Sequence, residues 1–472
     1  MNNKSISFIK NFSYTLASNL ISMLISVLIV LIVPKMIGVD QYGYFQLYLF
    51  YASYVGILHF GWNDGIYLKY GGAEYNKLDK RLFFSQFWML FLLESIISLI
   101  VFLFSPFITH DINKVFILKI ISLCLLFTNM RDMILYILQS TNRIKEYVQI
   151  TIIGRVFYFC ITVLFLIMGN FSFKYIIIGE LFGRFISLGY AIYKCKDIVF
   201  LKISLFYFSF KEALENMSIG IKLMFSNFAS MLIIGVVRFG IERAWDVDTF
   251  GKVSLTLSIS NFLMLFITAV GIILYPILRR TEDQKLSNIY FTMRNFIMIL
   301  LLGFLIVCYP LKSILYLWLP KYADSLKYMT LVFPMVLFAG KMELLINTYL
   351  KTLRKEKAML KINLVVLFFS ILLTSINVIV LKNLILTIVS IVILLSLRCI
   401  IAEIYLSSIL NISIYKDIFL ELIMTSIFIF TGWFINSWIA VLLYCLSYLL
   451  YLLIKRKDIV DTVQIMKILI KN

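Results

Sequence analysis

The sequence predicts an all-α, polytopic membrane protein with about fourteen transmembrane helices. They form two parallel-repeat six-helix bundles around a central cavity, and two further helices follow at the C-terminal end. Three observations predict this fold. Hydrophobic residues make up 62% of the 472 positions, long apolar segments follow one another almost without interruption, and a motif of the first half recurs in the second half.

The composition excludes a soluble fold. Only 15% of the residues are charged, which is too little polar surface for a water-exposed chain of this length. A membrane-spanning helix needs about 20 mostly apolar residues, and segments of this length exceed the strands of a membrane barrel. We expect helical spans at residues 10–33, 40–66, 82–105, 113–139, 146–169, 173–193, 213–237, 250–276, 288–309, 326–349, 357–381, 383–408, 416–434 and 436–454.

The net charge of +19 does not indicate nucleic-acid binding, because the basic residues lie in short clusters between apolar segments and not on one basic module. These clusters concentrate in every second loop, as in Lys351–Lys361 and Lys455–Lys457. Such an excess marks the cytoplasmic side, so both termini are expected in the cytoplasm. Scattered cysteines and only two histidines argue against a metal site.

An internal repeat relates the two halves. Ser18-Asn19 and Ser22-Met23-Leu24-Ile25 recur 208 residues later at Ser226-Asn227 and Ser230-Met231-Leu232-Ile233. At the same offset, Val39-Asp40-x-Tyr42-Gly43 matches Val247-Asp248-x-Phe250-Gly251, and the two aspartates are expected to be helix N-caps. Six spans separate the copies, so the halves are predicted to be parallel repeats. The predicted parts are a six-helix bundle at 1–194, a cytoplasmic interfacial linker at 195–212, a second bundle at 213–408, two extra helices at 409–454 and an amphipathic cytoplasmic tail at 455–472.

Two polar stripes, one in each half, are candidates for lining the central cavity. Residues at four-residue spacing lie near one face of a helix. An alternative is that the small serines only allow close helix packing, but a lysine facing lipid inside a span is costly. The predicted cavity-lining residues are Ser18, Ser22, Ser26, Ser226, Asn227, Ser230 and Arg238, and Lys222 lies on the second stripe.

Other charged residues are embedded in the predicted spans, Glu94 among them. Glu180 and Arg184 are one turn apart and are expected to neutralise each other in a structural pair. Arg155 and Lys222 have no carboxylate at such spacing. They are the best candidates for binding an anion such as phosphate, which Arg can grip with two hydrogen bonds. Arg294 is expected to extend to the membrane surface.

The sequence lacks the motifs of the common enzyme classes. Gly251-Lys252-Val253-Ser254 has neither the hydroxyl directly after Lys nor the earlier glycine of a nucleotide-binding loop. We therefore expect a transporter and not an enzyme, with no cofactor. Whether an H⁺ gradient, a Na⁺ gradient or the membrane potential drives it stays open.

The segment Pro34-Lys35-Met36-Ile37-Gly38-Val39-Asp40-Gln41-Tyr42-Gly43 and the stretch Gly61–Gly65 resemble the polysaccharide transport family. These are the Wzx-type flippases of the multidrug, oligosaccharidyl-lipid and polysaccharide exporter (MOP) superfamily. The resemblance implies transfer of an undecaprenyl-diphosphate-linked oligosaccharide, such as an O-antigen or capsule unit, to the outer leaflet of the bacterial cytoplasmic (inner) membrane. It also implies membrane lipid and other polysaccharide-assembly proteins as partners. Under this interpretation, the diphosphate or acidic sugars of the substrate would be attracted by five cations, Arg155, Lys222, Arg131, Arg184 and Lys341.

Two alternatives belong to other classes. A cation-coupled drug antiporter of the same superfamily would be expected to centre on membrane carboxylates, whereas cations are at least as prominent here. A glycan polymerase or ligase would need a catalytic outer loop. The largest outer loop, around Pro310–Lys327, offers no acid–base pair beyond Asp324.

Overall fold

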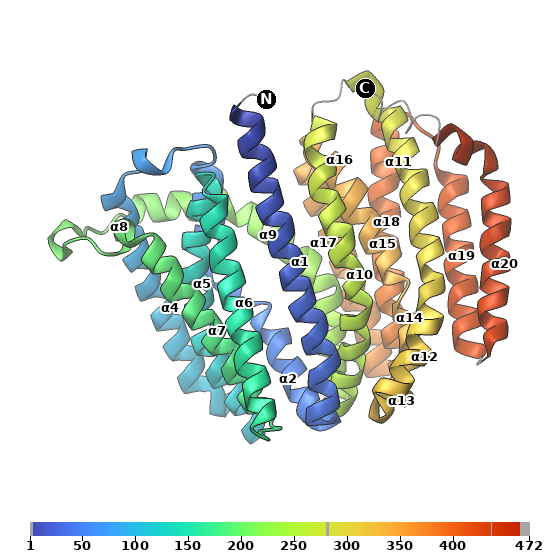
Figure 1. Cartoon of the computed structure of the whole chain (residues 1–472), viewed down its shortest axis with the longest axis horizontal. Coiled ribbons are helices and arrows are strands. Elements are labelled where there is room, and N and C mark those ends of the chain that lie inside the picture. Colours follow the sequence, from blue (N-terminus) through green and yellow to red (C-terminus); the bar gives the residue numbers. More distant parts are fainter. Residues whose placement is uncertain (1–2, 280–282, 436, 463–472) are drawn as a thin grey trace. The chain divides into compact units, whose positions relative to one another are not determined.

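The computed structural model describes residues 3–279, 283–435 and 437–462, with the side chains of this part except those of residues 3–13, 15, 16, 263 and 265–285. Every regular element in the described part is helical, which confirms the all-α prediction. The chain forms two compact units that divide between Phe228 and Ala229, inside one long helix. Figure 1 shows the elements of both units with their labels.

The first unit is built from helices that lie side by side along most of their length (Figure 1). Its elements are α1 (Asn3–Ile37), α2 (Val39–Ala52), η1 (Val55–His59), α3 (Trp62–Lys69), η2 (Tyr75–Lys77), α4 (Lys80–Ile108), α5 (Ile112–Ser140), α6 (Ile144–Ile167), α7 (Phe173–Lys194), α8 (Lys196–Val199), η3 (Ile203–Leu205) and the first part of α9 (Phe210–Ala244). The segment predicted as an interfacial linker, 195–212, contains α8, which packs on α4.

The second predicted span, 40–66, is not one helix. It is divided into α2, η1 and α3, and the break lies at Phe60 and Gly61, whose φ angles are 51° and 79°. A left-handed pair of residues cannot continue an α-helix. Apolar composition alone did not reveal this break, because the hydrophobic segment continues through it.

Glycines allow α3 and α9 to cross at backbone contact. A Cβ atom added to Gly65 would lie 1.9 Å from the carbonyl oxygen of Asn216. A Cβ on Gly220 would lie 2.0 Å from the carbonyl oxygen of Gly61. The Gly61–Gly65 motif therefore has a packing role at the end of the broken span.

The second unit surrounds a buried central segment. Its elements are the rest of α9, α10 (Val247–Arg279), α11 (Asp283–Phe304), η4 (Leu305–Val307), α12 (Cys308–Trp318), η5 (Pro320–Tyr322), α13 (Ala323–Leu326), α14 (Tyr328–Val332), α15 (Met335–Lys341), the π turn η6 (Met342–Ile346), α16 (Asn347–Thr352), α17 (Glu356–Ser375), the π turn η7 (Ile376–Val380), α18 (Leu384–Leu410), α19 (Tyr415–Phe434) and α20 (Trp438–Ile454). The segment Tyr328–Thr352 is the most enclosed, with 89% of its most apolar window buried.

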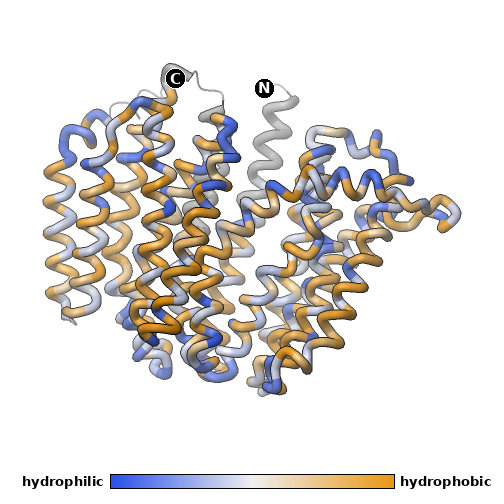
Figure 2. Tube along the Cα trace, turned by 180° about the vertical axis from the view of Figure 1, so that it is seen from behind, coloured by the Kyte–Doolittle hydropathy of each residue, from blue (hydrophilic) through white to orange (hydrophobic). Residues whose placement is uncertain are grey.

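Eleven helices within the described residues are long and apolar enough to cross a membrane. A twelfth results if α20 and the following Arg456–Thr462, bent by 69°, count as one span. The predicted number of fourteen is therefore not confirmed. In Figure 2, hydrophobic residues extend along the helices and hydrophilic residues gather toward the connections, as expected for a multi-pass membrane protein.

The repeat has a structural counterpart at its start. α1 and α9 are both 35 residues long, and each is followed by a helix that begins at a repeat-related valine, Val39 or Val247. The prediction that the two repeat-related aspartates are helix N-caps was wrong. Asp40 and Asp248 lie inside the first turns of α2 and α10, where a carboxylate favours the positive end of the helix.

The predicted division into five parts stays a prediction, since the two compact units divide within α9. For the C-terminal tail, the expected apolar face consists of Ile459, Val463, Met466 and Ile470. Its last three members lie outside the described residues.

Candidate functional site

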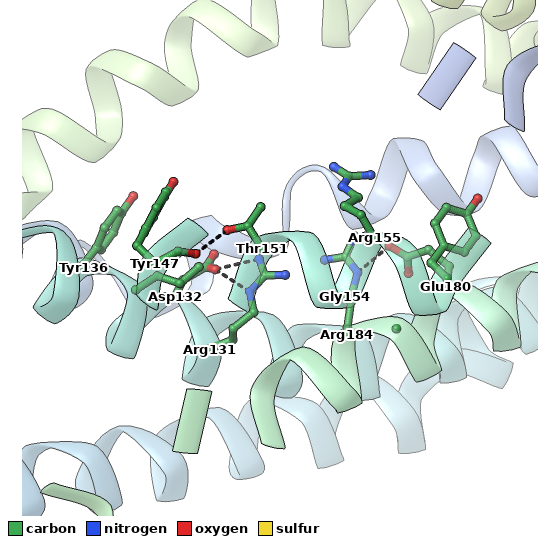
Figure 3. A pocket seen from close by; sticks show the side chains of 12 residues that line it. Arg131, Asp132, Tyr136, Tyr147, Thr151, Gly154, Arg155, Glu180 and Arg184 are labelled. Atoms are coloured by element: carbon green, nitrogen blue, oxygen red, sulfur yellow. Dashed lines mark hydrogen bonds and ion pairs between the residues drawn. The ribbon is translucent and has the colours of Figure 1, made fainter. Parts of the chain in front are cut away.

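A polar cavity of about 290 Å³ lies among α5, α6 and α7 of the first unit. Figure 3 shows its side chains from close by. It is lined by Arg131, Asp132, Leu135, Tyr136, Tyr147, Thr151, Gly154, Arg155, Tyr158, Glu180, Gly183 and Arg184. Three of the five residues predicted to attract substrate, Arg131, Arg155 and Arg184, are thus brought together from three different helices.

Close packing of α6 on α7 forms one wall of the cavity. A Cβ on Gly183 would lie 2.7 Å from the carbonyl oxygen of Gly154, and a Cβ on Gly154 would lie 2.8 Å from the Cβ of Ser187. Small residues at such a crossing let two membrane helices approach closely. Larger side chains on either side of this contact, Arg155 and Arg184, are then left to border the cavity.

Two of the three arginines are paired with carboxylates. Arg184 Nε lies 2.6 Å from a carboxylate oxygen of Glu180, which confirms the predicted pair one turn apart. Arg184 also donates to the Thr128 hydroxyl at 2.6 Å, and Glu180 accepts a 2.5 Å hydrogen bond from Tyr48 of α2. The pair on α7 is therefore fixed by hydrogen bonds from two neighbouring helices, α5 and α2.

Arg131 forms a pair that the sequence spacing did not favour. Its Nη2 lies 2.7 Å and its Nε 3.0 Å from the same oxygen of the adjacent Asp132. Neighbouring residues diverge around a helix, but the long arginine side chain reaches back to the carboxylate. The cavity thus contains two internally neutralised pairs.

Arg155 differs from Arg131 and Arg184. Its side chain is exposed, and in the described part of the chain it has no ion pair. Figure 3 shows its guanidinium directed away from the Glu180–Arg184 pair. A guanidinium that is not occupied by a carboxylate can form two parallel hydrogen bonds to a phosphate or carboxylate. Arg155 therefore gives the cavity its uncompensated positive charge.

Sequence reasoning missed the three tyrosines of the cavity, Tyr136, Tyr147 and Tyr158. Two of them could have been found, because Tyr147, Thr151, Arg155 and Tyr158 follow one another at helical spacing on α6. A tyrosine hydroxyl both donates and accepts a hydrogen bond. The cavity thus combines cations with groups that suit a hydroxylated ligand.

The predicted cavity-lining stripes lie on other helices. On α1, Ser18 is buried and Ser26 donates to the carbonyl oxygen of Ser22 at 2.9 Å. On α9, Ser226 is buried, Ser230 is half-buried and Asn227 and Lys222 are exposed. Arg238 donates to the Ser254 hydroxyl at 3.0 Å and lies over the ring of Phe250. Their role in lining a central cavity stays a prediction.

Lys341 is placed differently from its predicted role. It is 1% exposed and pairs with Glu403 and with Glu421, at 2.7 Å from the latter. The ammonium group of Lys341 is therefore paired with two carboxylates, and a substrate cannot reach it in this arrangement. We correct its prediction as an anion-binding residue accordingly.

Arg294 belongs to the same buried network, which corrects its predicted extension to the membrane surface. Its side chain is fully buried and lies 2.7 Å from Glu403, 2.6 Å from Glu421 and 3.3 Å from Asp417. Lys455, after α20, also pairs with Asp417. The network joins α11, α15 and α18 to α19 and the end of α20, so it fastens the two extra helices to the second unit.

Comparison with protein families finds one matching model, described as a polysaccharide biosynthesis protein, over residues 74–319. This range contains the whole cavity. A search of curated proteins finds no match.

Several solved structures share the fold. The inward-facing multidrug-resistance MATE transporter of the MOP superfamily superimposes with a TM-score of 0.62 at 12% identity, covering 83% of this chain and 98% of the other. The lipid II flippase MurJ in an inward closed conformation gives 0.61 at 15% identity, covering 95% and 99%. A MOP-superfamily transporter from Pyrococcus furiosus gives 0.53 at 12% identity, covering 86% and 97%. The fold is therefore that of the MOP transporters.

Proposed function

This chain belongs to the polysaccharide biosynthesis protein family, and from that membership we propose that it is a transporter, a flippase for a lipid-linked oligosaccharide. Its cargo would be an undecaprenyl-diphosphate-linked glycan unit, such as an O-antigen or capsule repeat. Movement would run from the cytoplasmic to the outer leaflet of the bacterial inner membrane, by alternating access. The distribution of basic residues supports an orientation with both termini in the cytoplasm.

The observation that carries the proposal is the charge balance of the cavity among α5, α6 and α7. Asp132 and Glu180 neutralise Arg131 and Arg184, so Arg155 remains as a net positive group in a membrane-embedded site. An unpaired cation inside a membrane protein is costly and marks a ligand or ion pathway. A diphosphate is the anionic part of the proposed cargo, and Arg155 is the residue suited to it.

The remaining cavity residues suit the same cargo. Tyr136, Tyr147 and Tyr158 offer hydroxyls for the sugar next to the diphosphate. Arg131 and Arg184 border the same cavity and remain proposed weaker contacts for the anion, because each is already paired with a carboxylate. Lys222, exposed on α9, remains a proposed second contact for the anion. One of the solved structures with this fold is a lipid II flippase, which is compatible with such a cargo.

A genetic experiment tests the proposal. Deletion of the gene in its own host should abolish the surface glycan and cause lipid-linked repeat units to accumulate in the inner leaflet. The wild-type gene should restore export, Arg155→Ala should not, and Arg243→Ala, at an arginine whose side chain is 56% exposed, should restore it as a control.

Three results would contradict the flippase. Normal surface glycan in the deletion strain would exclude it directly. Sensitivity to toxic small molecules without any change in lipid-linked intermediates would indicate the drug antiporter instead. Accumulation of single repeat units in the outer leaflet would indicate a polymerase or ligase.

A further inference from the structure

The buried face of α4 carries one polar side chain without a partner. Gln86, Glu94 and Ser98 lie on this face and are all buried. Gln86 accepts from the Trp62 indole at 2.7 Å and donates to Ser209, and Ser98 donates to the carbonyl oxygen of Ser122 on α5 at 2.7 Å. Glu94 is 0% exposed, yet neither of its carboxylate oxygens has a hydrogen bond within the described structure.

The groups around Glu94 are also hydrogen-bond acceptors. The Asn129 side chain of α5 lies beside the Glu94 carboxylate. Its amide nitrogen donates to the carbonyl oxygen of Val55 at 3.2 Å, and its side-chain oxygen accepts no hydrogen bond within the described structure. Asn63 of α3 donates to the carbonyl oxygen of Asn129 at 3.0 Å, and its own side-chain oxygen is likewise unsatisfied. Within the described part, none of these four buried side-chain oxygens accepts a hydrogen bond of normal geometry.

No neighbouring cation compensates Glu94. The charged groups and the histidine on the surrounding elements are His59 on η1, Asp64 and Lys69 on α3, Lys114, Lys119, Arg131 and Asp132 on α5, and Lys196 and Asp197 on α8. His59 lies 3.6 Å from Asp64, Lys69 pairs with Glu212 and Arg131 pairs with Asp132. Glu94 forms no ion pair with any of these groups among the described residues. An ionised carboxylate enclosed in this way, without partner or cation, is strongly disfavoured.

We propose that Glu94 is a proton-binding site and that the bound proton forms a hydrogen bond from the Glu94 carboxyl to the side-chain oxygen of Asn129. Protonation converts one of the four acceptor oxygens into a donor and removes the buried charge. It therefore satisfies two of the four oxygens at once. A sodium ion fits less well, because the site offers a single carboxylate and two amide oxygens, whereas hard cations favour several charged oxygen ligands.

The position of Asn129 connects this proton to the broken span. Val55 lies before the break at Phe60–Gly61 and Asn63 lies after it, and both are hydrogen-bonded to Asn129. When Glu94 loses its proton to water, the carboxylate needs a donor. Asn129 can supply one from its amide group, which has two N–H donors, and drawing that group toward the Glu94 carboxylate loosens its hydrogen bond to Val55 on η1. The protonation state of Glu94 thus controls how firmly η1, just before the break, is bound to α5, whatever molecule the chain transports.

Infrared spectroscopy of the purified full-length chain in lipid nanodiscs tests the proton. Titration in D₂O and H₂O should show the carbonyl stretch of a protonated, buried carboxylic acid. This band should be lost in Glu94→Gln and retained in Glu180→Gln, a matched control at another buried carboxylate, which is paired with Arg184. An unchanged spectrum in Glu94→Gln would overturn the proposal. So would a missing acid band combined with radioactive sodium binding that Glu94→Gln abolishes.

Hydrogen–deuterium exchange tests the link to the break. Backbone amides of residues 53–65 should exchange faster in the wild type than in Glu94→Gln at high pH, and equally at low pH, because glutamine keeps a donor facing Asn129 at every pH. Equal exchange at all pH values would overturn the link. If Glu94→Gln fails to fold, Glu94→Asp provides the test: its shorter side chain should shift the acid band, and an unshifted band would contradict a hydrogen bond to Asn129.

Discussion

Arg184 donates a 2.6 Å hydrogen bond to Glu180, one turn earlier on α7, and both side chains border the cavity that Arg155 also lines. Because this pair is satisfied, the positive charge available to a ligand comes from Arg155. That asymmetry between two arginines of one cavity is the basis of the first two predictions.

Arg155→Ala is expected to weaken binding of the diphosphate-linked cargo. Hydrogen bonds to charged groups contribute about 1.5–3 kcal/mol, which corresponds to a loss of affinity of roughly tenfold or more. Arg155→Lys should restore part of it, since a lysine keeps the charge and loses the two-pronged geometry. Binding of a soluble polyprenyl-diphosphate analogue to purified protein measures this. Equal affinity in wild type and Arg155→Ala would remove Arg155 from the site.

Glu180→Gln is expected to lower stability more than it lowers ligand binding. Removing one partner of an enclosed pair leaves an uncompensated charge. In a double-mutant cycle with Arg184→Gln, the pair should show a coupling of about 0.5–3 kcal/mol. The same cycle at Arg143 and Glu146, a more exposed pair 2.9 Å apart, should give less than about 1 kcal/mol. Thermal unfolding in detergent measures the coupling energies of both pairs, and equal couplings would contradict the prediction.

Gly65→Ala should destabilise the first unit. Its added Cβ would fall 1.9 Å from the Asn216 carbonyl oxygen, so α3 and α9 must separate, and overpacking of this kind costs about 1–3 kcal/mol. Gly189→Ala is the matched control, because a Cβ there meets nothing within 4 Å. In a helix this change is neutral or favourable. Equal melting temperatures for the two variants would show that the α3–α9 contact is looser than described.

Arg294→Leu should destabilise the second unit strongly, by about 3–5 kcal/mol, because Glu403 and Glu421 lose a buried partner. Limited proteolysis should then release α19 and α20, whose attachment depends on this network. Arg243→Leu, at a largely exposed arginine, is the control. If α19 and α20 stay protected in Arg294→Leu, the network is not what holds them.

Ion pairs between residues one helical turn apart could be predicted from the sequence, and ion pairs between residues far apart in the chain could not. The Glu180–Arg184 pair is four residues apart, so helical geometry alone brings it together. The partners of Arg294 lie 109 and 127 residues away, and no spacing rule connects them. For this reason Arg294 was expected at the surface and Lys341 in a ligand site.

The break in the second span was hidden for a different reason. Hydropathy detects segments that avoid water, and residues 40–66 remain apolar through Phe60 and Gly61. The left-handed conformation there depends on the packing of Gly61 against α9, which is tertiary information. The clustering of Arg131, Arg155 and Arg184 likewise required the arrangement of α5, α6 and α7, although each arginine had been identified as embedded.

The most direct test of the proposed function is translocation by the purified chain. Proteoliposomes with a lipid-linked oligosaccharide in one leaflet are exposed to an enzyme that cleaves the sugar on the outside only. We predict that the wild-type chain makes the inner pool accessible with time, that Arg243→Ala does the same, and that Arg155→Ala leaves the pool protected as in protein-free vesicles. Protection of the inner pool with folded wild-type protein under every imposed ion gradient would contradict the account.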